Sequence, residues 1–113
     1  MKTIEGIMLG TEGELQPIQV SRPTGGGLAI LAGLLECEDW EITCIQLTDW
    51  IHLWHSENQI REPNKAASRI TAQMGTGQQV RGKCLLVGTK PKMWEMTSLT
   101  PEQSATIAAV LAN

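Results

Sequence analysis

The residues best suited to hold a ligand are Trp50, His52 and Trp54, which alternate along a short stretch of the chain. If residues 50–55 form a β-strand, these three side chains point to one face, because successive side chains of a strand alternate between faces. Two indoles beside an imidazole can stack on a flat ligand such as a nucleobase. The same residues also suit a buried core or the centre of a subunit interface, where Trp is enriched. The sequence leaves these interpretations open.

Basic residues are concentrated in residues 61–92, which carry seven Lys and Arg against one acidic residue. Residues 1–60 carry nine acidic and two basic residues, a net charge of −7. Residues 61–92 have a net charge of +6 and residues 93–113 a net charge of −2, which gives −3 for the whole chain. This asymmetry predicts attraction between the two parts, within the fold or across an oligomer interface, or else an anion site. The candidate anion-binding residues are Arg61, Lys65, Arg69, Arg81 and Lys83.

A second candidate anion site is Arg22-Pro-Thr-Gly-Gly-Gly27, which precedes a predicted helix at residues 28–35. Free backbone N–H groups and the helix dipole favour an anion at a helix N-terminus, and Arg22 adds positive charge. The segment matches neither the P-loop, which ends in Gly-Lys-Ser/Thr, nor the GxGxxG dinucleotide pattern. A flexible turn before a helix cap at Thr24 is the simpler interpretation.

The cysteines and histidines do not form a catalytic or metal-binding pattern. Cys37, Cys44 and Cys84 are isolated from one another, and their odd number argues against a disulfide framework. His52 and His55 point to opposite faces of the predicted strand, and the residues around them lack the spacing of a zinc site. We therefore expect a protein that is not an enzyme and binds no metal or cofactor.

The hydrophobic pattern predicts a single α+β domain over residues 1–113, with a mainly antiparallel sheet and about three helices in the order ββαββαβ(β)α. Hydrophobic residues make up 42% of the chain, with four Trp and no Phe or Tyr, so aliphatic side chains must fill the core. Pro17 lacks a backbone donor, which indicates that the second strand lies at a sheet edge or begins later along the chain. Gly33 indicates close packing of the first helix against the sheet, and Thr100-Pro-Glu-Gln103 predicts a capping box. The predicted strands are residues 3–9, 15–20, 40–47, 50–55, 80–87 and 93–97, and the predicted helices are residues 28–35, 64–74 and 101–111.

Three segments carry a resemblance to a known family. They are Gly33 near the end of the first helix, the run from Leu53-Trp-His-Ser-Glu-Asn-Gln59 to Pro63-Asn-Lys-Ala-Ala-Ser68, and Val80-Arg-Gly-Lys-Cys-Leu-Leu-Val-Gly88 followed by Thr97-Ser-Leu-Thr-Pro-Glu-Gln103. In this order they resemble a small domain family of unknown function associated with phages and mobile elements. The resemblance implies an origin and an α+β fold, but no site residue. The Trp-rich middle strand and the triple glycine depart from the family pattern.

We therefore expect a non-enzymatic binding protein of phage or mobile-element origin that sequesters an anionic, nucleotide-like ligand to counter host defence. One alternative is an inhibitor or adaptor that docks on a host or phage enzyme, with Trp50 and Trp54 as anchors or with its acidic half as a mimic of nucleic acid. Another is an accessory nucleic-acid-binding protein, whose affinity would fall steeply with salt. Homo-oligomerisation fits all three. The sequence has no apolar run long enough for a membrane span and no signal-peptide pattern, so we expect no membrane partner and a cytoplasmic location.

Overall fold

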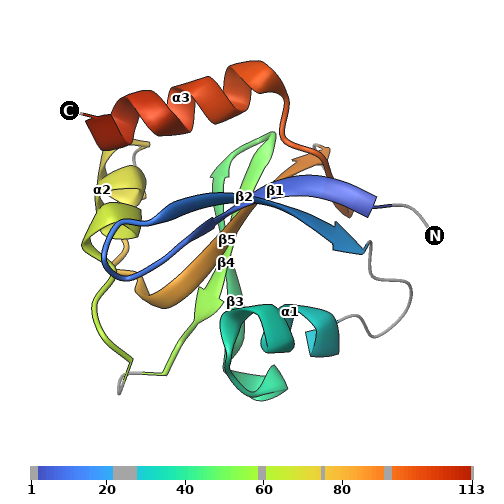
Figure 1. Ribbon diagram of the computed structural model, residues 1–113, viewed down its shortest axis with the longest axis vertical. Helices are drawn as coiled ribbons and strands as arrows, with labels where there is room; N and C mark the ends of the chain where they lie inside the picture. The colour runs from blue at the N-terminus through green and yellow to red at the C-terminus, as the bar shows by residue number, and fades with distance from the viewer. Residues whose placement is uncertain (1–2, 22–27, 59–60, 75, 91–92, 113) are drawn as a thin grey trace.

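The computed structural model describes residues 3–21, 28–58, 61–74, 76–90 and 93–112 (Figure 1). Its strands are β1 (Thr3–Leu9), β2 (Leu15–Ser21), β3 (Ile42–Thr48), β4 (Ile51–Ser56), β5 (Arg81–Lys90) and β6 (Met93–Thr97). Its helices are α1 (Leu28–Leu35), the 3-10 turn η1 (Asp39–Glu41), α2 (Lys65–Gln73) and α3 (Pro101–Ala112). The strands form one antiparallel sheet in the order β2–β1–β5–β4–β3, and β6 pairs with β5 outside this order. The predicted α+β fold and order of elements are confirmed.

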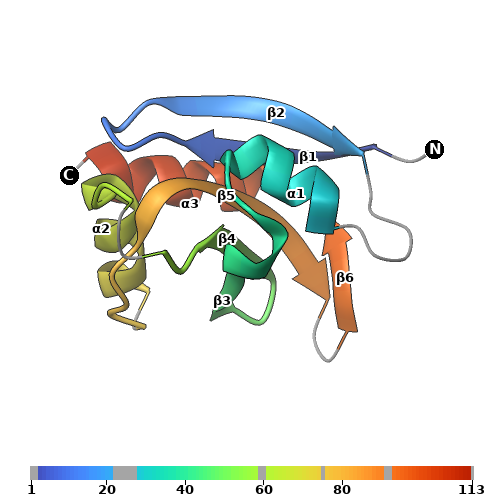
Figure 2. The ribbon, with the colours of Figure 1, turned by 90° about the horizontal axis from the view of Figure 1, so that it is seen from below.

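Helices cover both faces of the sheet, with α1 on one face and α2 and α3 on the other (Figures 1 and 2). Leu85 and Leu86 of β5 are both fully buried and point to opposite faces. Leu86 packs with Ile70 of α2 and Ile107 of α3 in one core cluster. Leu85 packs with Leu31 of α1 in the other. The sheet therefore separates two apolar cores, and both need β5.

Asn64 caps helix α2 and ties it to the sheet. Its side-chain oxygen accepts a hydrogen bond from the N–H of Ala67 at 3.0 Å. Its amide nitrogen donates to the carbonyl oxygens of Leu9, at 3.1 Å, and Gly82, at 2.9 Å. The side chain is fully buried, and a buried polar group left unpaired costs about 1–3 kcal/mol. One residue thus fixes α2 against β1 and β5.

The predicted capping box at the start of α3 is confirmed. The N–H of Gln103 donates to Oγ1 of Thr100 at 3.1 Å, and the N–H of Thr100 donates to Oε1 of Gln103 at 2.8 Å. Pro101 occupies the first helical position, where a missing N–H costs no helical hydrogen bond.

Three local predictions are wrong. Gly33 is exposed, and a methyl group added to it would meet no atom within 4 Å, so this glycine does not mark a close approach of α1 to the sheet. Strand β4 begins at Ile51, which leaves Trp50 in the turn before it. Residues 39–41 form η1, so β3 begins at Ile42 rather than at Trp40.

The substitution Gly33→Ala is expected to raise the free energy of unfolding by about 1 kcal/mol, because alanine is that much more favourable than glycine inside a helix. The added methyl group has room and removes backbone freedom from the unfolded chain. Urea unfolding followed by circular dichroism measures the change.

Gly6→Ala is the matched control, with the opposite sign expected. A Cβ at Gly6 would lie 2.8 Å from the carbonyl oxygen of Leu86, so strands β1 and β5 would have to separate. A lower stability for Gly33→Ala, or no loss for Gly6→Ala, would contradict this account of the two glycines.

Candidate functional site

The predicted Trp-His-Trp face does not form an open clamp. Trp50 is 55% exposed in the turn, whereas His52 is only 4% exposed. Trp54 packs against the core under α1, and its ring meets that of His52 edge to face with centroids 6.3 Å apart. Nε1 of Trp54 is buried and has no hydrogen-bond partner among the described residues. The structure therefore places His52 and Trp54 in the core region and leaves Trp50 at the surface.

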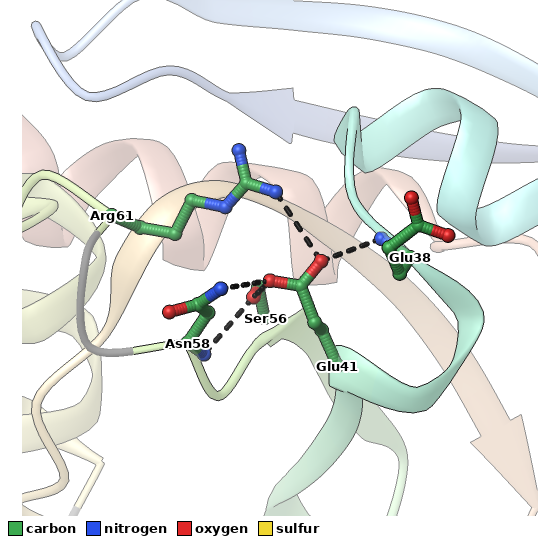
Figure 3. Close-up of polar contacts among 5 residues, drawn as sticks. All are labelled: Glu38, Glu41, Ser56, Asn58 and Arg61. Atoms are coloured by element: carbon green, nitrogen blue, oxygen red, sulfur yellow. Dashed lines mark hydrogen bonds and ion pairs between the residues drawn. The ribbon is translucent and has the colours of Figure 1, made fainter.

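Arg61 is part of a polar network centred on Glu41, a residue the sequence did not single out (Figure 3). Glu41 is 2% exposed, and Oε2 accepts from the N–H of Glu38 at 2.6 Å and from Nη2 of Arg61 at 3.3 Å. Oε1 accepts from Nδ2 of Asn58 at 2.5 Å and from Oγ of Ser56 at 3.4 Å. The carboxylate thus joins η1 to the end of β4 and the segment after it.

The network keeps Glu41 ionised. The hydrogen bond from the Glu38 N–H, followed by that from Asn58, lowers the pKa of the Glu41 carboxyl below its usual range, with Arg61 adding to the effect. A carboxylate whose oxygens already accept four hydrogen bonds is poorly placed to act as a general base. Glu41 therefore has a structural role.

Two further predicted basic residues make contacts within the fold. Nζ of Lys83 lies 2.7 Å from Oε2 of Glu36, and this hydrogen-bonded ion pair lowers the pKa of the Glu36 carboxyl. Nη1 of Arg81 donates to the carbonyl oxygen of Arg61 at 3.1 Å. The ion pairs Lys83–Glu36 and Arg61–Glu41 support the interpretation that the acidic and basic parts of the chain attract each other within the fold.

Lys65 and Arg69 lie elsewhere, on helix α2. They line a pocket of about 360 Å³ together with Glu12 of the β1–β2 turn and Leu111 near the end of α3. Nη1 of Arg69 donates to the carbonyl oxygen of Leu111 at 3.3 Å. The predicted basic residues therefore fall into two groups with different neighbours. Arg22 lies outside the described residues, as does the glycine segment that follows it.

Two of the thiols and both imidazoles are in environments that disfavour their charged forms. Burial raises the pKa of Cys44 and of Cys84 to about 12, which disfavours the nucleophilic thiolate. Burial lowers the pKa of His52 and of His55, and Nδ1 of His55 lies 3.0 Å from the carbonyl oxygen of Ser56. Within the described ranges, no three His, Cys, Asp or Glu residues gather to hold a metal ion.

A pocket of about 600 Å³ lies between the β1–β2 hairpin and α3, where no site was predicted. Its walls are mainly apolar, and Glu5 is the one charged residue among the described residues that line it. Leu15, which is 38% exposed, contributes to the wall. The lining residues are Glu5, Gly6, Ile7, Leu15, Pro17, Ile18, Gln19, Leu99, Ser104, Ala105 and Ala108.

Comparisons with protein-family models, with curated proteins and with solved structures found no match for this chain. No helix in the described part of the chain is long and apolar enough to cross a membrane. The site must therefore be judged by the chemistry of its own residues.

Stability is expected to fall in two separate pH ranges. His52 and His55 have lowered pKa values in the folded protein, so below about pH 6.5 the unfolded chain binds more protons and stability falls with pH. Glu41 also has a lowered pKa, so its contribution is complete above about pH 4.3 and is lost as the pH falls through its folded value. Urea unfolding at intervals from pH 8 to pH 3 measures both.

Two variants show which residue causes the loss of stability in each pH range. His55→Gln should reduce the loss of stability between pH 7 and pH 5, and Glu41→Gln should reduce only the loss below about pH 4.5, in both cases because the titrating group is gone. The assignment fails if Glu41→Gln reduces the loss of stability between pH 7 and pH 5, or if His55→Gln loses as much stability as wild type in that range.

Proposed function

We propose that this chain is a non-enzymatic binding protein whose pocket between the β1–β2 hairpin and α3 holds an apolar, positively charged segment of a partner polypeptide. The main support for this function is the size and apolar lining of the pocket. Its volume of about 600 Å³ lies within the range of ligand-binding pockets, and Ile7, Pro17 and Leu99 give it an apolar wall. This function belongs to the inhibitor or adaptor class expected as an alternative from the sequence.

The charge around the pocket favours a cationic occupant. Glu5 lines the pocket, and strands β1 and β2 contain no Lys or Arg. Residues 101–112 of α3 contain Glu102 and no Lys or Arg. The N–H of Leu99 donates to the carbonyl oxygen of Glu5, so the start of α3, with Glu102 in its first turn, lies beside Glu5. A Lys or Arg in the partner would meet complementary potential there, and an anion would not.

Selection of random peptides of about twelve residues on the immobilised protein tests the proposal. Selected sequences are expected to combine apolar residues with Lys or Arg. A consensus peptide should bind Ala108→Trp at least tenfold more weakly than wild type, since the indole would fill the pocket. Ala109→Trp is the matched control, because Ala109 is exposed on α3 but does not line the pocket.

Three results would overturn this function: no enrichment of any sequence, selected peptides without basic residues, or equal binding to wild type and Ala108→Trp. Circular dichroism of both Trp variants shows whether α3 remains folded. Both substitutions lie on α3, replace an exposed Ala and add the same side chain. A difference in peptide affinity between the two variants therefore comes from the pocket.

A second candidate function is the sequestration of an anionic, nucleotide-like ligand, in keeping with the resemblance to a phage- and mobile-element-associated family. Lys65 and Arg69 support it, because both line the pocket beside the start of α2. Nucleic-acid binding has less support, since the basic residues lie in two groups and Arg61 and Lys83 are already in ion pairs.

Isothermal titration against a panel of cyclic nucleotides and ADP-ribose nucleotides tests this second function. We expect heat of binding with wild type and with Arg81→Ala, and its loss in a Lys65→Ala, Arg69→Ala double variant. Absence of heat with wild type at micromolar protein concentration would eliminate this candidate.

A further inference from the structure

The two edges of the sheet, at opposite sides in Figure 2, are protected to different degrees. On β1, the N–H of Glu5 donates to Oγ of Ser98 and its carbonyl accepts from Leu99, so Glu5 turns its backbone groups away from β2. The direction of the N–H and C=O groups alternates along an antiparallel strand, so those of Ile7 also point away from β2. Ile7 pairs with Pro17, and the nitrogen of Pro17 therefore points away from β1, to the outside of the sheet. The β2 edge therefore lacks a donor at its centre, which is a common protection against pairing with another chain. The predicted edge position of Pro17 is confirmed.

The β3 edge carries no such protection. Among the described residues, β3 has β4 as its one neighbouring strand, and its sequence Ile-Thr-Cys-Ile-Gln-Leu-Thr contains no charge, Pro or Gly. The Glu57 N–H donates to the Glu41 carbonyl at 2.7 Å, which makes these two residues a hydrogen-bonded pair. By alternation, Ile42, Cys44 and Gln46 direct their N–H and C=O groups outward. A shift in register between Gln46 and Thr48 ends this regular stretch.

Exposed tryptophans lie at both ends of this edge. Trp40, in η1 just before β3, is 77% exposed, and Trp50, in the turn just after it, is 55% exposed. Large apolar side chains are costly to leave in water and are enriched at the centres of interfaces. An uncharged strand bordered by two exposed indoles has the composition of an interface.

We propose that β3 pairs antiparallel with β3 of a second copy of this chain, around a two-fold axis at Cys44. In this register Cys44 faces Cys44 of the second copy and Ile42 faces Gln46, so every outward group of the regular stretch finds a partner, in about six hydrogen bonds. Trp40 of each copy comes opposite Thr48 of the other, beside the turn that carries Trp50. An antiparallel two-fold pairing is self-complementary, which makes a second copy the occupant that this edge fits. The pairing is independent of the proposed pocket, which lies beside the other edge.

Sedimentation velocity from about 1 to 100 μM protein tests the pairing, with a monomer mass of 12.3 kDa as reference. Wild type is expected to sediment as a dimer at the upper concentrations. Gln46→Pro removes an outward donor from each copy without removing a hydrogen bond to β4, and should raise the dissociation constant at least tenfold. Trp40→Ser should weaken the dimer without disturbing the fold, because this indole is largely in solvent.

Gln19→Pro is the matched control. Gln19 pairs with Glu5, so its N–H also faces outward, but from the β2 edge. This variant should dimerise as wild type does. The proposal is overturned if wild type stays monomeric at 100 μM, if Gln46→Pro and Trp40→Ser both dimerise unchanged, or if Gln19→Pro disrupts the dimer as strongly as Gln46→Pro.

Cross-linking tests the register. Paired residues of this kind have Cα atoms about 5.5 Å apart, a separation a disulfide can span. In a Cys37→Ser, Cys84→Ser background, diamide should take two electrons and two protons from a Cys44 pair and give a covalent dimer, and adding Cys44→Ser should abolish it. If Cys44 of the associated dimer reacts with iodoacetamide at mildly alkaline pH but gives no covalent dimer with diamide at the same pH, this register is overturned.

Discussion

The burial of β5 on both faces is the constraint on which the rest of the fold depends. Residues 84–87 of this strand are each 0% exposed, and β1 and β4 flank it in the sheet. Since each face of an apolar strand must be covered, the chain needs helices on both sides of the sheet. Helices α1 and α2 have eight and nine residues, too few to be stable alone in water, so their helicity depends on packing against β5.

The start of β5 also determines where the opposite charges meet. Gly82 has a φ of 71°, a left-handed conformation that favours glycine, and the pairing with β4 shifts register close to it. The aliphatic part of Arg61 lies over Gly82, with Cβ 3.5 Å from the position that a Gly82 Cβ would occupy. From there its guanidinium reaches Glu41, and Lys83 reaches Glu36. Two residues of the basic segment, Arg61 and Lys83, are therefore paired with the acidic part of the chain, which weakens the case for a single large anion site.

Several local features of the fold could be predicted from the sequence, because caps, periodicity and proline act within a few residues. Helix α1 has the predicted bounds, and the capping box at Thr100 and the edge position of Pro17 are confirmed. The exposure of Trp50 could not be predicted, since a shift of one residue at the start of β4 moves a side chain from a strand face to a turn. The Glu41 network and the pocket beside α3 join segments far apart in the sequence, so no local spacing predicts them.

The two proposed surfaces lie on opposite edges of the sheet, and this separation has a consequence for binding. Pairing through β3 would extend the sheet across the two-fold axis and place the two β2 edges at its far ends, so that neither pocket is covered by the second copy. A dimer would then present two acidic, apolar pockets to one partner. Two weak contacts joined in this way bind far more tightly than one, because the second forms at a high effective concentration. A small protein with a shallow binding surface gains from this arrangement, since its affinity does not have to come from one pocket alone.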